Sequence, residues 1–323
     1  MSAATSTEAL DLNKKQINPA LIKKAKRGGL ITDIRENTTS YLMMTPFLLL
    51  FLVFIVIPVV VSIVLSLFYY NVISTPSWVG WDNFKRLFLD DDIFGIAVKN
   101  TLVFAIITGP VSYFLCLIFA WLVNELSPKV RALATFMFYV PSMCGNAIFI
   151  FQYMFSGDAY GLLNGWLMKL GMINSPVLWL KDPSYMLAIC MIVQLWMSLG
   201  TGFLVFIAGL QGIDKEMYEA AAIDGIRNRW QELALITLPS MKPQLKLGAV
   251  LQITGSFAVS GICSSLCGFP SPLYAAHTVV LHMEDYGTTR YEMGYALAIA
   301  VVLFLVTVIT SRLILKLLKE KTY

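Results

Sequence analysis

Charge is scarce in this sequence, and that scarcity narrows the class of protein. Only 14% of the 323 residues are Asp, Glu, Lys or Arg, whereas 57% are hydrophobic, and the mean hydropathy is +0.70. A soluble domain of this length does not need so much apolar surface. The formal net charge of +4 is also too small to indicate a nucleic acid as a partner. The composition therefore predicts a polytopic membrane protein in a lipid bilayer.

Catalytic signatures are missing as well. The chain contains no Gly-x-x-x-x-Gly-Lys-Ser/Thr phosphate loop, no His-Glu-x-x-His pair, and no Ser or Cys nucleophile motif beside a histidine. We therefore expect no enzymatic activity, no cofactor and no ATP hydrolysis by this chain alone. If transport through the chain is active, its energy comes from a partner or from an ion gradient.

Residues that bind metals or form disulfides are few. The two histidines, His277 and His282, lie five residues apart in a segment without a convincing helical pattern, so we expect solvated loop side chains and no metal site. The five cysteines have no paired spacing in a polar loop, so we expect small buried side chains and no disulfide framework. These cysteines are Cys116, Cys144, Cys190, Cys263 and Cys267.

Six apolar stretches are long enough to cross a bilayer, which requires about 20 residues of helix. Prolines within the first three stretches are expected to kink the helices without ending them. The fifth stretch is the least hydrophobic, which is typical of a helix that packs among others or lines a cavity. The predicted spans are residues 42–68, 101–123, 133–155, 186–210, 245–264 and 294–318.

The basic residues are distributed unevenly about these spans. Most of the 24 Lys and Arg residues lie in the N-terminal tail and in the segments that follow the second, fourth and sixth spans. The tail has neither the apolar core nor the cleavage site of a signal peptide. Because basic residues favour the cytoplasmic side, we expect both termini to be cytoplasmic. We divide the chain into a cytoplasmic basic tail, residues 1–40, and one membrane domain, residues 41–323.

One polar interruption, residues 214–239, lies between the fourth and fifth spans. Its first part, residues 215–224, is rich in residues with a high helix propensity. Asp214 is placed to cap the free amides at the start of this helix. Gly225 is expected to end it in a left-handed conformation.

A second short helix is predicted directly afterwards. Asn228 is a favourable first residue, and Gln231 follows three positions later in the pattern of a capping box. The helix should not continue past Pro239, which lacks an amide hydrogen. The interruption is therefore predicted to be a helix, a glycine elbow and another helix.

The residues of this interruption resemble a known family. Glu219-Ala220-Ala221, Gly225 and Ile236-x-Leu238-Pro239 are similar to the EAA motif of permease subunits of bacterial ABC importers. In that family the helix pair docks into a groove on the ATPase. Ten residues separate Gly225 from Ile236, one more than the family's usual spacing. Within a docking loop at residues 211–243, the resemblance implies contacts from Tyr218, Glu219, Ala220, Ala221, Asp224, Gly225, Ile236, Leu238 and Pro239.

The resemblance covers most of the chain from about residue 42 onward and is strongest to the carbohydrate-uptake branch. It implies the six-helix, all-α fold of type I importer permeases and a multi-pass location in the bacterial cytoplasmic membrane. The implied partners are a second permease subunit, two ATP-binding subunits and an extracytoplasmic solute-binding protein. The implied substrate is a mono- or oligosaccharide, while a glycerol-phosphate-type solute and a stand-alone secondary carrier remain alternatives. Further matching features are Phe84, Asn100-Thr101-Leu102, Tyr160-Gly161-Leu162-Leu163-Asn164, Gly209-Leu210-Gln211 and Gly294-Tyr295-Ala296.

The transport pathway is predicted from polar residues inside the spans. No span carries a charged residue or a histidine in its middle, which disfavours proton coupling and an anionic substrate. Hydroxyl, amide and aromatic side chains suit a neutral polyhydroxylated solute, although packing between helices explains each of them equally well. The candidates by side-chain chemistry are Ser142, Asn146, Gln152, Tyr153, Gln194, Trp196, Ser198, Thr201, Thr254, Ser256, Phe257 and Ser260. The family resemblance favours Gln194, Met197, Ser198, Thr201, Thr254, Phe257, Ala258 and Gly261.

Overall fold

The computed structural model describes residues 37–318, apart from the side chain of Asn146. The predicted basic tail therefore lies almost entirely outside the described residues. The side chain of Asn146, a predicted pathway residue, also lies outside what the structure describes. The chain divides into two compact units after Val61, which are described separately.

The first unit contains most of one long helix. α4 (Thr38–Phe51) continues through a π-helical turn, η1 (Leu52–Val56), into α5 (Ile57–Leu65). Pro46 and Pro58 both lie inside this helix, and neither ends it, as predicted. The helix is long and apolar enough to cross a membrane, and its large apolar side chains are exposed. Such an exterior is expected of a helix that contacts lipid or other membrane helices.

The second unit contains the remaining spans. Four stretches there are long and apolar enough to cross a membrane, whereas the third predicted span is a helix pair bent by 83°. The all-α, polytopic fold is confirmed, and the described residues provide six spans when the bent pair is taken as one. The fourth and fifth spans are each interrupted near their middle or end. The spans are α7 (Asp92–Asn124), α8 (Pro128–Met143) with α9 (Ile148–Met154), α11 (Pro183–Met197) with α12 (Thr201–Gln211), α16 (Lys242–Phe257) with α17 (Gly261–Cys267), and α19 (Met293–Leu317).

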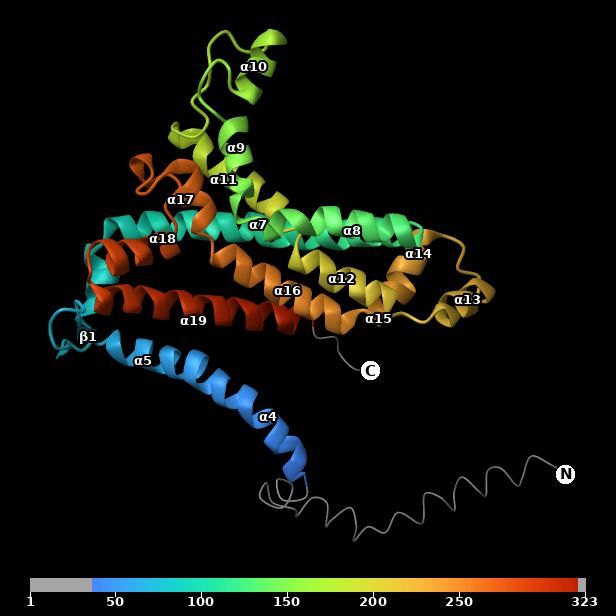
Figure 1. Cartoon of the computed structure of the whole chain (residues 1–323), viewed down its shortest axis with the longest axis horizontal. Helices are drawn as coiled ribbons and strands as arrows, with labels where there is room; N and C mark the ends of the chain where they lie inside the picture. Colours follow the sequence, from blue (N-terminus) through green and yellow to red (C-terminus); the bar gives the residue numbers. More distant parts are fainter. Residues whose placement is uncertain (1–36, 319–323) are drawn as a thin grey trace. The chain divides into compact units, whose positions relative to one another are not determined.

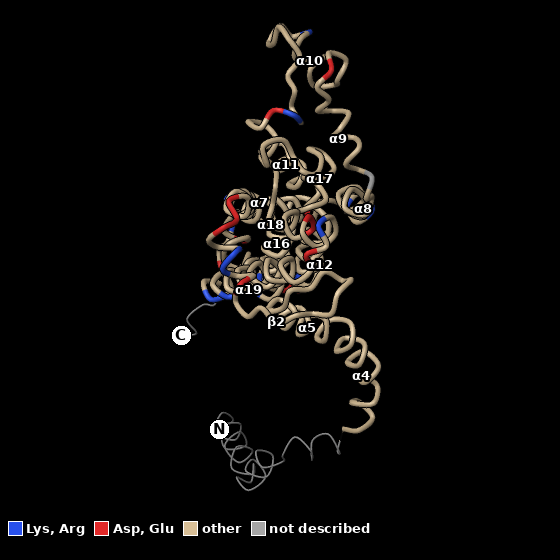
Figure 2. Tube along the Cα trace, turned by 90° about the vertical axis from the view of Figure 1, so that its left-hand side faces the viewer, with Lys and Arg blue, Asp and Glu red and all other residues tan. Residues whose placement is uncertain are grey.

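Helix α7 is the centre of this unit. It packs against α12, α16, α11 and α8, and α16 packs in turn against α12 and α19 (Figure 1). α9, α11 and α17 pack together on one side of these long helices. Figure 2 shows that Lys, Arg, Asp and Glu occur in short groups on a trace that is otherwise uncharged.

The start of α7 differs from the prediction. The helix begins at Asp92, well before residue 101, because the carboxylate of Asp91 accepts a hydrogen bond from the amide of Phe94 at 2.9 Å. Carboxylates are favourable at a helix N-terminus, where the backbone amides are unpaired and the helix dipole is positive. Within the acidic run, Asp90 ends η2, Asp91 caps α7, and Asp92 is the first residue of α7.

The loop after the third span contains a short helix, α10 (Leu162–Lys169). Asn164 is fully buried and organises the loops around this helix. Its amide nitrogen donates to the carbonyls of Ser156 and Val177 at 3.1 and 3.0 Å, and its carbonyl oxygen accepts from Trp179 Nε1 at 2.8 Å. The remaining short elements are β1 (Phe68–Tyr69), β2 (Ser77–Trp78), α6 (Asp82–Lys85), η2 (Arg86–Asp90), η3 (Gly145–Ala147), η5 (Pro272–Tyr274), α18 (Val279–Glu284) and η6 (Asp285–Thr289).

The expectation of solvated loop histidines is wrong. His277 and His282 are each only 1% exposed, and His282 lies on α18, a helix that the sequence pattern did not predict. His277 Nε2 lies 3.2 Å from His282 Nδ1, and His282 Nε2 lies 3.0 Å from a carboxylate oxygen of Asp91. Tyr295 donates its hydroxyl to the same carboxylate at 2.6 Å. We call these four residues the histidine cluster. Each of them makes a hydrogen bond within the cluster, and the buried Nδ1 of His277 has no partner among residues 37–318.

The cysteine prediction is correct for four residues and wrong for one. Cys116, Cys190, Cys263 and Cys267 are buried, whereas Cys144 is exposed at the bend between α8 and α9. All five are free thiols. Within residues 37–318, no group of three or more His, Cys, Asp or Glu side chains could hold a metal ion.

Candidate functional site

The predicted helix–elbow–helix is present. It consists of α13 (Lys215–Ile223), α14 (Arg229–Glu232), the π-helical turn η4 (Leu233–Thr237) and α15 (Leu238–Ser240). We call this segment the docking pair. It lies at the end of the unit where α12 ends and α16 begins (Figure 1). The docking pair therefore joins the two interrupted spans directly.

The elbow of the docking pair is set by Gly225. Its φ angle is +93°, a conformation that side chains with a Cβ rarely adopt. The amide of Gly225 donates to the carbonyl of Ala222 at 3.3 Å, and the amide of Ile226 donates to the carbonyl of Ala221 at 3.0 Å. These two bonds form a Schellman motif, which fixes the direction in which the chain leaves α13.

The two predicted caps differ in detail from the structure. Asp214 is the N-cap residue of α13, but its side chain accepts no helix amide, and its backbone carbonyl accepts from Met217 at 3.2 Å instead. Asn228 does cap α14, although its side chain accepts from Trp230 at 3.0 Å rather than from Gln231. Both helices therefore begin where predicted.

The second helix continues one residue further than predicted. Pro239 does not stop it, because α15 runs from Leu238 to Ser240. The π-helical turn η4 precedes this segment, so Pro239 stands near the start of a new helical turn.

The two arms of the docking pair are held together by a polar contact and an apolar one. The hydroxyl of Tyr218 lies 3.1 Å from that of Thr237, which is buried. Ala221 and Ile236 are 8% and 7% exposed and both line the space between the arms, so the EAA motif and the end of the second arm lie close together. A groove of about 490 Å³ lies between the arms and is lined by Met217, Ala220, Ala221, Asp224, Ile226, Leu235, Ile236, Pro239 and Ser240.

The remaining motif residues of the docking pair are exposed to solvent. Glu219 is exposed, and so are Ala220, Asp224 and Pro239, which also line the groove between the arms. The structure adds Ile223, which is 88% exposed, and Leu235, which is 64% exposed. Sequence reasoning missed both, although an apolar residue in a strongly polar segment is a signal for a contact surface. The small side chain of Ala220 permits close approach to a partner.

The docking pair is also tied to the end of α7. Arg229 forms ion pairs with Glu232 at 2.8 Å and with Glu125 at 3.2 Å, and the hydrogen bond that Arg229 donates to Glu232 and the charge of Glu125 raise the pKa of Arg229. The rings of Trp230 and Trp121 lie 5.1 Å apart between centroids. These exposed ion pairs add little stability by themselves. Together with the tryptophan contact, they connect the docking pair to the end of α7.

The predicted pathway residues lie near the interruptions of the spans. Ser142, at the end of α8, packs so closely on Gly200 that a Cβ at Gly200 would collide with it. Gly200 stands between α11 and α12 with non-helical dihedral angles, and Thr201 follows it with its side chain exposed. Ser198 donates its hydroxyl to the carbonyl of Leu195 at 2.7 Å. Gln194 and Met197 are half-buried, and Trp196 is 38% exposed and lies edge to face with Phe151.

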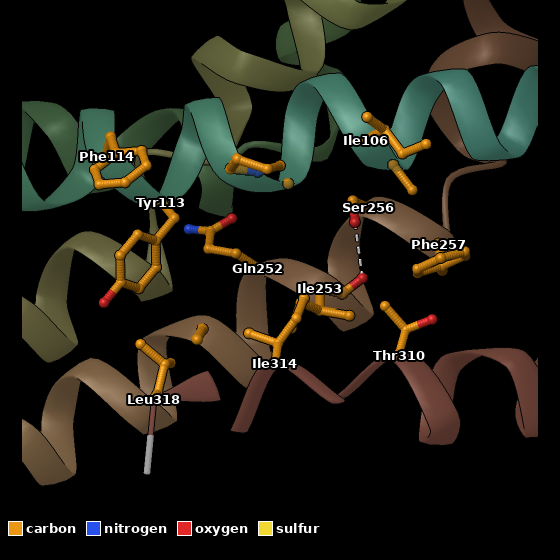
Figure 3. A pocket seen from close by; sticks show the side chains of 14 residues that line it. Ile106, Tyr113, Phe114, Gln252, Ile253, Ser256, Phe257, Thr310, Ile314 and Leu318 are labelled. Atoms are coloured by element: carbon orange, nitrogen blue, oxygen red, sulfur yellow. Dashed lines mark hydrogen bonds between the residues drawn. The ribbon is translucent and has the colours of Figure 1, made fainter. Parts of the chain in front are cut away.

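The fifth span divides the predicted residues between two faces. Thr254, Ala258 and Gly261 are exposed, whereas Phe257 is 6% exposed and Ser256 is 4% exposed. Phe257 and Ser256 instead line an apolar pocket of about 310 Å³ between α7, α16 and α19 (Figure 3). The structure therefore does not bring Phe257 together with Thr254 and Ala258.

These features define a class of protein. Two of the apolar spans are interrupted at places where small and hydroxyl-bearing residues are exposed. The exposed docking pair joins these two spans and can contact a partner at the membrane surface. A rigid helix pair of this kind transmits movement from a partner to the spans, which is the architecture of a membrane transport subunit driven from outside itself.

Comparisons with known proteins agree with this class, although no family model matches the chain. It is 30% identical to a probable ABC transporter permease protein, YesP, of Bacillus subtilis, over 87% of this chain and 91% of that protein. It is 32% identical to the arabinooligosaccharides transport system permease protein AraP of the same species, over 87% and 89%. It is 28% identical to the lactose transport system permease protein LacF of Rhizobium radiobacter, over 85% and 92%. The chain belongs to the permease proteins of ABC transporters.

The solved structures support the same fold. A bacterial ABC transporter for import of the acidic polysaccharide alginate matches with a TM-score of 0.70 at 23% identity, covering 91% of this chain and 99% of that chain. A second alginate transporter structure, in complex with a periplasmic protein that holds an alginate pentasaccharide, matches with a TM-score of 0.67. The resemblance to ABC importer permeases noted in the sequence is thereby confirmed, and the chain is a multi-pass membrane protein.

Proposed function

We propose that this chain is the carbohydrate-translocating permease subunit of a binding-protein-dependent ABC importer. A second permease subunit, two ATP-binding subunits and an extracytoplasmic solute-binding protein would complete the assembly. The named relatives act on lactose and arabinooligosaccharides, and a structural neighbour was solved with a periplasmic binding protein, which supports this assignment. The chain itself performs no chemistry in this proposal, because ATP is hydrolysed by its partners.

The observation that carries the proposal is the docking pair. Glu219 and Asp224 present carboxylates on its exposed face, while Ala221 and Ile236 are buried between its arms. The Schellman motif at Gly225 holds the arms at a fixed angle. When the ATP-binding subunits close, a rigid pair moves as one body and displaces the ends of α12 and α16.

The docking pair is cytoplasmic in this proposal, and so are both termini. Within the described residues, Lys215, Arg227, Arg229 and Lys242 all lie in or beside the docking pair. Basic residues concentrate on the cytoplasmic side of membrane proteins, where ATP is also available. The opposite ends of the spans, including α10 and the histidine cluster, would face the solute-binding protein.

The translocation path would lie on the exposed face formed by the interrupted spans. Thr201, Thr254, Ala258 and Gly261 are small or hydroxyl-bearing and are exposed in this single chain. Polar side chains inside a membrane normally face the interior of a bundle or a water-filled cavity. A second permease on this face would enclose the path between the two subunits.

A neutral carbohydrate suits this face better than an anionic solute. Among residues 37–318, the charged side chains in the spans lie near helix ends, such as Lys99 in α7, Lys246 in α16 and Arg312 in α19. An anion would need a cation near the middle of the path to offset its desolvation. A panel of neutral and acidic saccharides therefore tests the substrate class.

The proposal is tested by the ATPase activity of the complete complex reconstituted in lipid, with its binding protein and that panel. We expect one neutral sugar to stimulate hydrolysis, and Glu219→Arg to reduce the stimulated rate by about tenfold or more, since a reversed charge opposes docking. Glu219→Gln, which removes the charge without reversing it, is the matched comparison and should reduce the rate less. Sugar uptake that persists without any ATPase would favour a secondary carrier and refute the proposal.

A further inference from the structure

Gln252 is a buried amide in the middle of α16, only 8% exposed. Its side chain points from α16 toward α7 (Figure 3). Ser112 of α7 donates to Gln252 Oε1 at 3.0 Å and shares that proton with the carbonyl of Thr108. Gln252 Nε2 donates in turn to the thiol sulfur of Cys116, also on α7, at 3.2 Å. One side chain thus bonds two positions of α7, one turn apart.

The same amide contacts a third helix. Gly202 lies in the first turn of α12, and a Cβ added there would collide with Nε2 of Gln252 and lie 3.6 Å from Cys116 Sγ. Only a glycine allows the backbone of α12 to come this close. The side-chain amide of Gln252 therefore contacts both α7 and α12, close to the interruption of the fourth span at Gly200.

Cys116 connects Gln252 to that interruption. Its thiol donates to the backbone carbonyl of Ser198 at 3.4 Å. Ser198 follows the last residue of α11, and the carbonyls at a helix end lack the amides that a continuing helix would supply. Inside a membrane such a carbonyl must find a partner within the protein, and Cys116 provides it.

The donors and acceptors form one consistent series. The Ser112 hydroxyl donates to Gln252, the Gln252 amide donates to Cys116, and the Cys116 thiol donates to Ser198. Gln252 stands in the middle of this series because an amide group both accepts and donates. A hydrophobic side chain of the same size could fill the space but would break both links.

We propose that Gln252 is a positioning residue for carbohydrate recognition. Through Cys116 it holds the interruption at Ser198 in one geometry, and that geometry fixes where Ser198 and Thr201 meet the sugar. Thr254, two residues further along α16, is fixed relative to them by the same contact. This inference rests on the proposed function for its substrate, but the geometry that it assigns to Gln252 is independent of that substrate.

The first test measures sugar preference in the reconstituted complex, using lactose, maltose and an arabinooligosaccharide as probes. We expect Gln252→Leu to change the ratio of uptake rates between the two best sugars by about fivefold or more, because misplaced hydroxyl partners affect each sugar differently. Cys116→Ser, which keeps a group that accepts and donates, should retain the wild-type ratio. Gln244→Leu is the matched control, since Gln244 lies two turns earlier on α16 and its carbonyl oxygen has no hydrogen-bond partner among residues 37–318.

The second test measures position without any sugar. Spin labels are attached at Thr201→Cys and Asp90→Cys in a Cys144→Ser background, in which the other four cysteines are buried. The distance distribution between the labels is then recorded by pulsed electron spin resonance. Gln252→Leu should shift or broaden this distribution, whereas Gln244→Leu should leave it as in the wild type.

The two tests separate the inference from the proposed function. If Gln252→Leu slows uptake of every sugar equally and leaves the distance distribution unchanged, Gln252 only packs the spans and the inference is overturned. If the wild-type complex transports none of the sugars, the proposed function fails, and the distance measurement alone then decides whether Gln252 positions the interruption.

Discussion

The docking pair and the histidine cluster show two different ways of building a polar structure in an apolar chain. The docking pair is formed by residues that are close in sequence, such as Gly225 and Asn228, and its outer face is exposed. The histidine cluster joins Asp91 to His282 and Tyr295, which are about 190 and 200 positions away in the chain, and it is almost completely buried. The first structure is local and open, and the second is long-range and closed.

This difference predicts a division of roles. Few buried contacts hold the docking pair, so changes on its surface should alter coupling to a partner and leave the stability of the fold intact. Each member of the histidine cluster is a buried polar group that loses its partners when a neighbour is removed. Changes there should lower stability and affect coupling only through unfolding.

The largest effect is expected from Asp91→Ala. This change leaves the Tyr295 hydroxyl, the His282 ring and the amide of Phe94 without an acceptor, which should cost about 3 kcal/mol. We expect the unfolding temperature in detergent to fall by roughly 5–10 °C. Asp90→Ala, at the exposed neighbouring carboxylate, should have no measurable effect. If both variants unfold at the wild-type temperature, the histidine cluster does not contribute to stability, and the proposed difference in role between the cluster and the docking pair is refuted.

A smaller effect on stability, but a clear one on coupling, is expected from Gly225→Ala. A left-handed conformation costs a residue with a Cβ about 1–2 kcal/mol, so the elbow should relax to another angle. Sugar-stimulated ATPase activity should fall by about fivefold while basal activity is retained. Gly225→Asn provides the control, because asparagine adopts left-handed conformations more readily than alanine does. Equal loss of stimulation in both variants would mean that coupling does not depend on the left-handed geometry of the elbow.

The same contrast explains what the sequence could predict. The docking pair follows from signals within a few residues: a run of good helix formers, a glycine and an asparagine cap. The structure confirms these elements and corrects three details: the Asp214 side chain caps no amide, Asn228 caps the amide of Trp230, and the helix containing Pro239 ends one residue later. The partner in each of those interactions is no more than five residues away.

The histidine cluster could not be predicted in this way. His277 and His282 lie in a segment whose short helix, α18, is stabilised by contacts with α7 and α19. The pattern of apolar residues within the segment itself does not indicate those contacts. The interruptions of the fourth and fifth spans were missed for a related reason, since hydropathy measures apolar character and not backbone direction. Gly200 marks one interruption, but a glycine inside an apolar run is equally compatible with a continuous helix.

The smallest effect concerns pH. Burial lowers the pKa of His277 to about 4, with a further lowering by His282, and burial also lowers the pKa of His282. Burial alone would raise the pKa of Asp91, but the hydrogen bonds from Tyr295 and Phe94 outweigh it, and the pKa is lower than usual. The charged groups that face the cluster from neighbouring elements are Arg86, Asp285, Arg290 and Glu292, together with the ring of Tyr286.

The direction of the pH effect follows from these shifts. An unfolded histidine binds its proton near pH 6.5, whereas folded His277 remains neutral until about pH 4, so the unfolded state gains protons first as the pH falls. The stability that neutral His277 provides is complete above pH 6.5, decreases below it, and should be lower by about 1–2 kcal/mol at pH 5. The unfolding temperature should therefore fall by a few degrees between pH 7.5 and 5. His277→Gln keeps a donor toward His282 but cannot titrate, so its unfolding temperature should change less over the same range; a profile as steep as that of the wild type would exclude His277 as the group responsible.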